Sequence, residues 1–177
     1  MNKLDHHWIA SKLNQNKQVF VDLLAGTMKE EYEWKPSSDQ WCMLEIICHL
    51  YDEEREDFRT RVKHVLASTD TPPPSWDPLG ALKSRNYMDM DFNAKLADFC
   101  TERDASVQWL ESLGDVNWTN AWQHPKFGPM SAWMFLSNWL AHDYLHIRQI
   151  TRLKYNRLKD LSNETLRYAG NWDVKVN

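Results

Sequence analysis

The sequence has little cysteine, little glycine and no long apolar run. Only 3 of its 177 residues are cysteine and only 5 are glycine. Cys42, Cys48 and Cys100 lack the spacing of a zinc finger, and an odd number of reduced thiols is typical of a cytoplasmic protein. No stretch approaches the roughly 20 apolar residues of a membrane span, and the N-terminus lacks the apolar centre of a secretion signal. We therefore expect a cytoplasmic protein with no membrane partner.

An excess of positive charge is also missing. Lys and Arg together number 21 against 25 Asp and Glu, which gives a formal net charge of −4. Because nucleic acids bind basic surfaces, we expect no nucleic-acid partner. The 10 tryptophans suit a large core, but they also suit a cleft or an interface. A chain of 177 residues fits one domain, which we place over residues 1–177.

Apolar residues recur at helical spacing in four segments. The predicted helices cover residues 9–24, 39–67, 92–114 and 129–155, and a short final helix covers 162–170. Ser37 and Gln40 have the spacing of a capping box before the second helix, and Pro129 suits the first turn of the fourth. We find no strand-like alternation of useful length and no internal repeat. The sequence therefore predicts an all-α protein, a four-helix bundle.

The connection between the second and third predicted helices is long and irregular. Residues 68–90, STDTPPPSWDPLGALKSRNYMDM, are too rich in proline to form a regular helix. A structureless loop of this length is usually functional or disordered. Trp76, Tyr87 and Met88 indicate that the segment packs on the bundle, so we interpret it as a lid-like loop. The loop is long enough to cross the bundle, so a simple up-down-up-down order does not follow.

The fourth predicted helix carries two histidines four residues apart, in WLAHDYLHIRQI, residues 139–150. At 100° per residue, His142 and His146 share the stripe that faces the bundle interior, whereas Asp143 points away and suits a cap or an interface. The two histidines are either ligands of one metal ion or hydrogen-bonded core residues. His49 is the other histidine well placed for the interior. Three histidines with open positions would make a catalytic rather than a structural metal site.

His49 conflicts with the apolar pattern of its own helix. The clearest apolar stripe on the second helix includes Leu44, Ile47 and Tyr51, and His49 lies on roughly the opposite side. Either His49 is a surface residue, or this helix is buried on both sides. A cleft on one flank and a subunit interface on the other would satisfy the second option. The pattern therefore predicts a homodimer.

Three segments carry a resemblance to a known family. They are WKPSSDQWCMLEIICHLYDEE (34–54), DFCTERDASVQWLESL (98–113) and HPKFGPMSAWMFLSNWLAHDYLHIRQITRLKY (124–155). The chain resembles the DinB-like family, four-helix metal-binding bundles related to bacterial thiol-dependent transferases. Family members share a Trp-x-Pro, a following Trp, a helical His-Leu and a final His-Asp-x-x-His-x-x-Gln-Ile. The similarity spans about residues 30–157, and by this resemblance His49, His142 and His146 take the three metal-ligand positions.

The resemblance implies a DinB-like bundle that holds a divalent metal ion, zinc or nickel first, with iron or manganese as alternatives. It implies a metal-dependent enzyme with a small-molecule substrate, either a low-molecular-weight-thiol S-transferase or a hydrolase. The alternative is a non-enzymatic stress-response or binding protein whose metal is structural or absent. A fourth ligand from Glu53 or Cys42 would favour that alternative. Glu45, Glu53 and Gln149 are candidates to orient the ligand rings. No catalytic residue is assigned.

Overall fold

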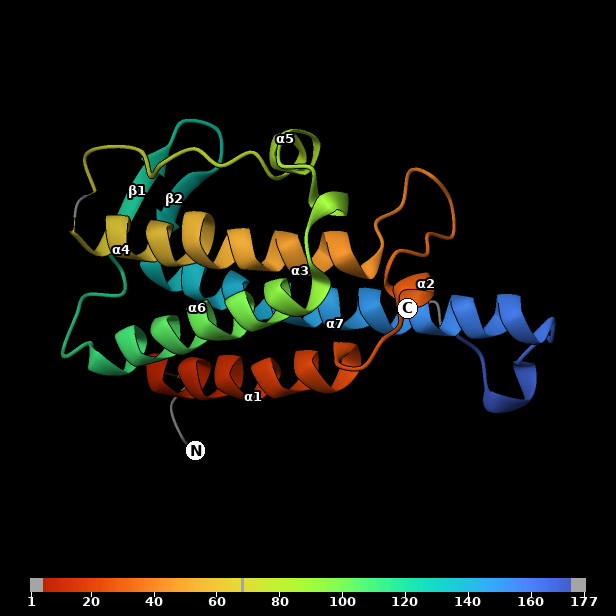
Figure 1. Ribbon diagram of the computed structural model, residues 1–177. Coiled ribbons are helices and arrows are strands. Elements are labelled where there is room, and N and C mark those ends of the chain that lie inside the picture. Colours follow the sequence, from red (N-terminus) through yellow and green to blue (C-terminus); the bar gives the residue numbers. More distant parts are fainter. Residues whose placement is uncertain (1–4, 68, 173–177) are drawn as a thin grey trace.

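The structure is a bundle of four long helical segments (Figure 1). The computed structural model describes residues 5–67 and 69–172. The first long segment is α1 (His6–Leu24). The second is a continuous run of three elements, α3 (Met43–Asp52), the π-helical η1 (Glu53–Phe58) and α4 (Arg59–Ala67). The third and fourth are α6 (Phe92–Ser112) and α7 (Ala132–Ser162). The small elements are α2 (Lys29–Tyr32), α5 (Pro78–Ser84), the 3₁₀ turns η2 (Tyr87–Asp89) and η3 (Arg167–Ala169), and strands β1 (Ala121–His124) and β2 (Gly128–Ser131). The predicted four-helix bundle is confirmed.

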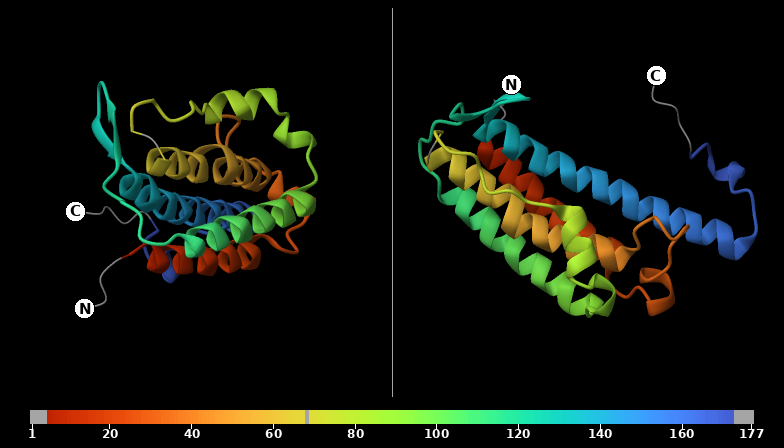
Figure 2. Two further views of the ribbon diagram at one scale, coloured as in Figure 1. Left: turned by 90° about the vertical axis from the view of Figure 1, so that its left-hand side faces the viewer. Right: turned by 90° about the horizontal axis from the view of Figure 1, so that it is seen from above.

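The order of the helices differs from an up-down-up-down bundle. α1 packs against α6 and α7, and the α3–α4 run packs against the same two helices from the other side. The connection between α4 and α6 returns along the length of that run, so α6 is parallel to it (Figures 1 and 2). α7 runs antiparallel to both, as α1 does. Among the described helices, none combines the length and the apolar character needed to cross a bilayer.

The second bundle segment starts later than predicted. α3 begins at Met43 instead of Asp39. Its cap is the Glu45 side chain, which accepts a hydrogen bond from the Cys42 backbone N–H at 2.9 Å. The predicted cap residue, Ser37, donates instead to the Asp39 side chain at 2.6 Å. The predicted start is wrong because the reciprocal cap forms around a cysteine, a residue that helix-capping preferences do not favour.

A β-hairpin precedes α7, where the sequence predicted an irregular stretch and a helix starting at Pro129. β1 pairs antiparallel with β2, with Trp122 opposite Met130, and Pro129 lies within β2. α7 begins only after Ser131, whose side chain accepts a hydrogen bond from the Met134 backbone N–H at 3.1 Å. The predicted helix start is wrong, and the hairpin is a small addition to the predicted all-α fold that the sequence analysis missed. Strands of four residues are too short to show a recognisable alternation.

The end of α7 also differs from the prediction. The helix continues past Tyr155 to Ser162 and ends where Asn163 adopts a left-handed conformation with φ 54°. Ser162 therefore ends a helix instead of capping a new one. The predicted final helix over residues 162–170 is reduced to the single 3₁₀ turn η3.

The connection between α4 and α6 is more regular than predicted. It contains α5, which begins with Pro78 at its N-terminus and is capped by Asp77. The Asp77 side chain accepts a hydrogen bond from the Gly80 backbone N–H at 3.0 Å. The prediction that the segment packs on the bundle is confirmed, since Tyr87 is 4% exposed and belongs to the core. The prediction that it lacks regular structure is wrong in part, because proline is well tolerated in the first turn of a helix.

Both faces of α3 are covered by the chain itself. Every side chain from Cys42 to Leu50 is buried, and His49 is only 4% exposed. α3 packs against α6, α7 and α5. The option that His49 is a surface residue is therefore excluded. Because the burial of both faces arises within one chain, it does not require a subunit interface, and the homodimer stays a prediction.

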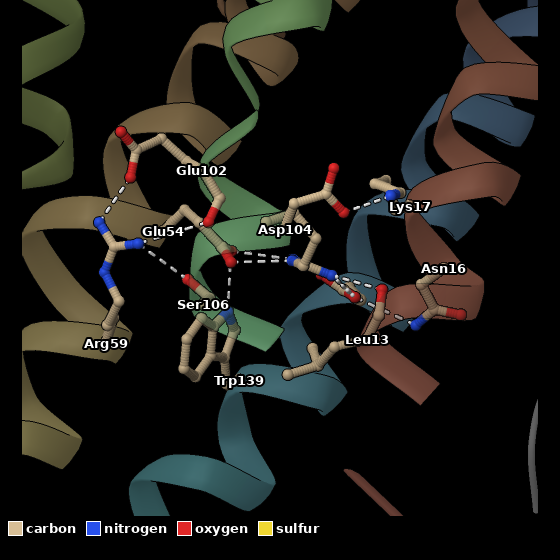
Figure 3. A network of polar contacts seen from close by, with 11 residues as sticks. Leu13, Asn16, Lys17, Glu54, Arg59, Glu102, Asp104, Ser106 and Trp139 are labelled. Carbon is tan, nitrogen blue, oxygen red and sulfur yellow. Dashed lines mark hydrogen bonds and ion pairs between the residues drawn. The ribbon is translucent and has the colours of Figure 1, made fainter. Parts of the chain in front are cut away.

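A buried ionic cluster joins all four bundle segments (Figure 3). Arg103 of α6 is 1% exposed, and all five of its N–H donors are used. The guanidinium donates twice to Glu54 of η1 at 2.9 Å, and twice to Asp143 of α7 at 2.7 and 2.8 Å. It also donates to the Leu13 carbonyl oxygen of α1 at 3.0 Å. One side chain thus links α6 to the other three segments.

Two further donors complete the hydrogen bonding of the carboxylates. Trp139 Nε1 donates to Glu54 at 3.0 Å, and Asn16 Nδ2 donates to Asp143 at 3.1 Å. Buried charges are tolerated in a protein interior only when they are paired and hydrogen-bonded, as these are. The expectation that Asp143 caps a helix or lies at an interface is wrong, because this side chain is buried in the ionic cluster.

Replacing Arg103 with methionine should strongly destabilise the protein, because Glu54 and Asp143 would remain as buried charges without their partner. We expect a loss of about 3–5 kcal/mol in the free energy of unfolding, measured by urea denaturation. Arg148 is an exposed arginine on α7, and R148M serves as the matched control. The control should change the free energy by less than about 0.5 kcal/mol. Equal losses for the two variants would contradict a stabilising role for the cluster.

Candidate metal centre

The three histidines identified in the sequence meet in the structure. His49 comes from α3, and His142 and His146 come from successive turns of α7. The Nε2 atom of His142 lies 3.3 Å from Nε2 of His49 and 3.1 Å from Nε2 of His146. The ligand atoms of all three lie within 4.8 Å of one another. Among the described residues, no other group of three or more His, Cys, Asp or Glu side chains has this geometry.

The spacing of the nitrogens fits a single divalent ion. Imidazole nitrogens bind zinc at about 2.0–2.1 Å, so two ligands of a tetrahedral ion lie about 3.3–3.4 Å apart. The observed separations of 3.3 and 3.1 Å are close to that value. Each neutral imidazole has only one N–H to donate, so hydrogen bonds alone satisfy three converging rings poorly. The residues present therefore fit a metal ion better than a set of ordinary core histidines.

Burial keeps the three imidazoles in the neutral form that a metal ligand requires. Burial, with a smaller effect from His146, lowers the pKa of His49 to about 3. Burial and the two neighbouring histidines lower the pKa of His142 to about 2. Burial also lowers the pKa of His146. At pH 7 the cluster presents lone pairs instead of positive charges.

A comparison of the sequence with known protein families identifies the family of the chain. Residues 12–150 match the profile of the DinB superfamily. The chain belongs to the DinB superfamily. The membership predicted from the three sequence segments is confirmed. No curated protein matches the sequence.

The fold is similar to that of a solved bacterial structure. YfiT from Bacillus subtilis is described as a probable metal-dependent hydrolase with an unusual four-helix bundle topology. The two structures superimpose with a TM-score of 0.76 at 15% sequence identity, over 89% of this chain and 91% of that one. At this identity the likeness shows a shared fold.

In this DinB-superfamily chain, side chains one turn away contact two of the three rings. A hydrogen bond of 2.8 Å joins Nδ1 of His146 to Oε1 of Gln149. Because an amide oxygen only accepts, Nδ1 carries the proton and Nε2 keeps its lone pair. Oε1 of Glu53 lies 3.6 Å from Nδ1 of His49. The third candidate, Glu45, was predicted wrongly, because it caps α3 instead of facing a ring.

Neither candidate for a fourth ligand belongs to the three-histidine group. Glu53 faces the Nδ1 side of His49, whereas the His142 ring approaches Nε2. Cys42 Sγ contacts Sδ of Met88 at 3.6 Å, and burial raises the pKa of its thiol to about 11. A thiol with such a pKa stays protonated at neutral pH and is a poor ligand. In the described part of the chain the group therefore consists of three neutral ligands.

The histidines line a cleft of about 590 Å³. This volume lies in the range of about 300–1,000 Å³ that is typical of small-molecule sites in proteins. α7 contributes Leu145, Gln149, Arg152, Leu153 and Asn156 to the wall, and the opposite side contains Asp39, Gln40, Trp41, Glu53 and Pro78. Among these described residues Arg152 is the only lysine or arginine. The cleft therefore combines apolar and polar walls with one permanent positive charge.

Two tryptophans lie near the site, Trp76, which was expected to pack on the bundle, and Trp41, which the sequence analysis did not assign a place. The ring of Trp41 lies edge-on to His49, with 4.9 Å between ring centroids. Nε1 of Trp76, in the connection between α4 and α6, donates to Oε1 of Glu53 at 2.5 Å. The indole of Trp76 is thus hydrogen-bonded to Glu53, the side chain that faces the candidate ligand His49.

The π-helical turn η1 divides two consecutive glutamates between two environments. Glu53 and Glu54 are 6% and 2% exposed. Glu53 faces His49, and Glu54 binds Arg103 in the ionic cluster. Short π-helical turns are rare and occur often at functional sites. The turn that breaks the regular helix is therefore the one that joins the candidate site to the ionic cluster.

The metal-free protein should lose stability as the pH falls below about 6.5, the ordinary pKa of histidine. In the folded protein the pKa values of His49 and His142 are about 3 and about 2. Between these values and 6.5 the unfolded chain binds protons that the folded chain does not bind. The free energy of unfolding keeps its full value above pH 6.5. As the pH falls below 6.5, it decreases by at most about 1.4 kcal/mol per pH unit for each histidine.

Urea denaturation in the presence of a chelator, from pH 7.5 down to 4.5, measures this dependence. The variant H142Q should show a shallower loss of the free energy of unfolding with falling pH, because glutamine does not titrate. Identical slopes for the wild type and H142Q would contradict a neutral His142 with a lowered pKa.

Proposed function

We propose that His49, His142 and His146 bind one divalent metal ion through Nε2, and that the protein is a metal-dependent enzyme with a small-molecule substrate. The observation that carries the proposal is the convergence of three neutral imidazoles, two buried and one partly buried, on the wall of a cleft. Zinc or nickel is the expected ion, with iron or manganese as alternatives. Imidazole ligands suit several of these ions, so the ligand set alone does not select one.

The chain supplies the ligands, the orientation of the rings and the shape of the cleft. A divalent ion bound there acts as a Lewis acid, which lowers the pKa of a coordinated water or thiol and polarises a carbonyl. Gln149 orients the ring of His146 by accepting a hydrogen bond from Nδ1–H of that ring. Leu145 and Leu153 line the cleft beside the histidines and make this part of its wall apolar. Arg152 also lines the cleft.

We propose two reactions for this site, transfer of a low-molecular-weight thiol and hydrolysis. Thiol transfer is supported by the resemblance of the sequence to a family related to thiol-dependent transferases. Hydrolysis is supported by the fold shared with YfiT, which is described as a probable metal-dependent hydrolase. The non-enzymatic alternative with a structural metal needs a closed site, and neither Glu53 nor Cys42 belongs to the ligand group.

Protein prepared without a histidine tag should bind close to one equivalent of zinc or nickel, measured by mass spectrometry of the metal after dialysis. H146A should lose this metal, because two imidazoles hold a divalent ion much less firmly than three. H64A is the matched control, since His64 bonds the Thr71 carbonyl oxygen at 3.0 Å and lies outside the ligand group. A wild type that binds neither ion, or an H146A variant that keeps a full equivalent, would contradict the proposed ligands.

The metal-loaded protein should accelerate either the loss of a small thiol in the presence of an electrophile or the hydrolysis of an activated ester. The rate should fall by at least about a hundredfold in H146A, because several kcal/mol of charge stabilisation would be lost. Cysteine with 1-chloro-2,4-dinitrobenzene tests thiol transfer, and p-nitrophenyl acetate tests hydrolysis.

The two assays separate the proposed reactions. Consumption of the thiol in step with the electrophile supports the transferase, and ester cleavage without a thiol supports the hydrolase. H64A should retain the wild-type rate in either assay. Equal rates for the wild type and H146A in both assays would favour the non-enzymatic alternative.

The homodimer and the cytoplasmic location complete the proposal. Cys42, Cys48 and Cys100 are free thiols, which favours a reducing compartment. Leu158 and Leu161 near the end of α7 are 55% and 64% exposed, and apolar side chains on an open helix face suit contact with a second subunit.

A further inference from the structure

A chain of contacts leads from the connection between α4 and α6 to one candidate ligand. Nδ1 of His49 is buried and has no hydrogen-bond partner among the described residues. Oε1 of Glu53 lies 3.6 Å from this nitrogen, slightly beyond hydrogen-bond distance. The same oxygen accepts the hydrogen bond from Nε1 of Trp76 at 2.5 Å. Trp76 and His49 thus face one carboxylate oxygen from two sides.

The unpaired nitrogen of His49 requires an explanation. A buried polar atom without a partner destabilises the protein by about 1–3 kcal/mol, so such atoms are rare in folded proteins. If Nε2 of His49 binds a metal ion, its Nδ1 carries the ring proton and needs an acceptor. The Glu53 carboxylate is the acceptor within reach, because a shift of a few tenths of an ångström would close the 3.6 Å gap.

Trp76 does not reach Glu53 as part of a loose loop. The segment from Trp76 to Tyr87, which we call the strap, is tied to the same side of the bundle. Arg85 donates to both oxygens of Glu56 at 2.8 Å and pairs with Asp52 at 2.8 Å. The Tyr87 hydroxyl also donates to Asp52. The Arg85 guanidinium lies over the Trp76 ring, 5.1 Å from its centroid. The indole N–H is therefore held in place by neighbours outside the cleft.

We infer that Trp76 is a positioning residue of the metal site that acts through Glu53. The Trp76 indole fixes Oε1 of Glu53, and this oxygen accepts a hydrogen bond from Nδ1–H of His49, which directs Nε2 toward the metal. This inference rests on the proposed metal-binding function. It adds a coupling between the strap and the site: a docked strap raises the affinity for the metal, and bound metal favours the docked strap by the same factor.

Zinc affinities of five proteins test the inference, each measured by competition with a chromophoric chelator. The proteins are the wild type, W76F, E53Q, the double variant W76F/E53Q and W109F. W76F keeps an aromatic ring but removes the N–H, and its dissociation constant for zinc should rise about threefold to tenfold, as for the loss of one hydrogen bond. E53Q should weaken binding about tenfold to a hundredfold, as outer carboxylates of metal sites do.

The double variant distinguishes a relay from two separate effects. If Trp76 acts through Glu53, W76F weakens zinc binding less in the E53Q background than in the wild type, because an amide oxygen accepts a weaker hydrogen bond from the indole than a carboxylate does. W109F is the matched control, since Trp109 is a partly buried indole of α6 that packs on a different part of the core. It should bind zinc as the wild type does.

Proton NMR of the cobalt-substituted protein provides a readout that a purely structural role would not change. Each coordinated imidazole gives a paramagnetically shifted, exchangeable Nδ1–H resonance. The resonance of His49 should broaden in W76F and E53Q, because a weaker acceptor lets its proton exchange faster with water. The resonance of His146, whose Nδ1–H donates a hydrogen bond to Gln149, should stay sharp.

Each outcome has a definite meaning. A W76F affinity equal to that of the wild type, or losses that add in the double variant, would overturn the inference while the metal-binding function stands. Unchanged affinity in E53Q, which keeps the strap sequence intact, would overturn it even if W76F failed to fold. A wild type that binds no zinc would overturn the proposed function and the inference with it.

Discussion

The fold depends on one buried cation. Arg103 is enclosed at the centre of the bundle, and the groups it binds come from three other helical segments. Neither η1, α6 nor α7 can shift alone without leaving a charge unpaired in the interior, and a shift of α1 would remove the Leu13 carbonyl that accepts from Arg103. The carboxylates of Glu54 and Asp143 outnumber the guanidinium, so the cluster carries a net negative charge. A divalent cation held by neutral ligands next to it would be stabilised by that charge.

Adjacent residues belong to the ionic cluster and to the cleft. On α7, His142 meets the other histidines, while Asp143, about 100° further round the helix, binds Arg103. On η1, Glu53 faces the histidines while Glu54 binds Arg103. Because the same helical turns carry both sets of side chains, the rigidity of the cluster extends to the ring positions. A metal site needs this support, since its ligands must be held to within about 0.5 Å.

Helical periodicity was sufficient to predict the long helices and to place His142 and His146 on one face of the last helix, because a buried face repeats every 3.6 residues. His49 could be assigned only by resemblance to a family, because its helix is buried on all sides and no face stands out. The hairpin was missed because its strands are too short for a pattern. Arg103 was missed because a charge on a helix normally indicates solvent, and its partners lie far away in the sequence. The contact of the strap with Glu53 depends on the path of a long connection, which local preferences do not determine.

The arrangement of α1 has a consequence for how the protein is made. α1 packs mainly against α6 and α7, which are synthesised much later (Figure 2). During translation its apolar side, which includes Ile9, Leu13 and Phe20, lacks its main packing partners until the second half of the chain has left the ribosome. The nascent protein thus holds a largely uncovered amphipathic helix for most of its synthesis. Such a helix is the kind of surface on which chaperones act and from which aggregation begins.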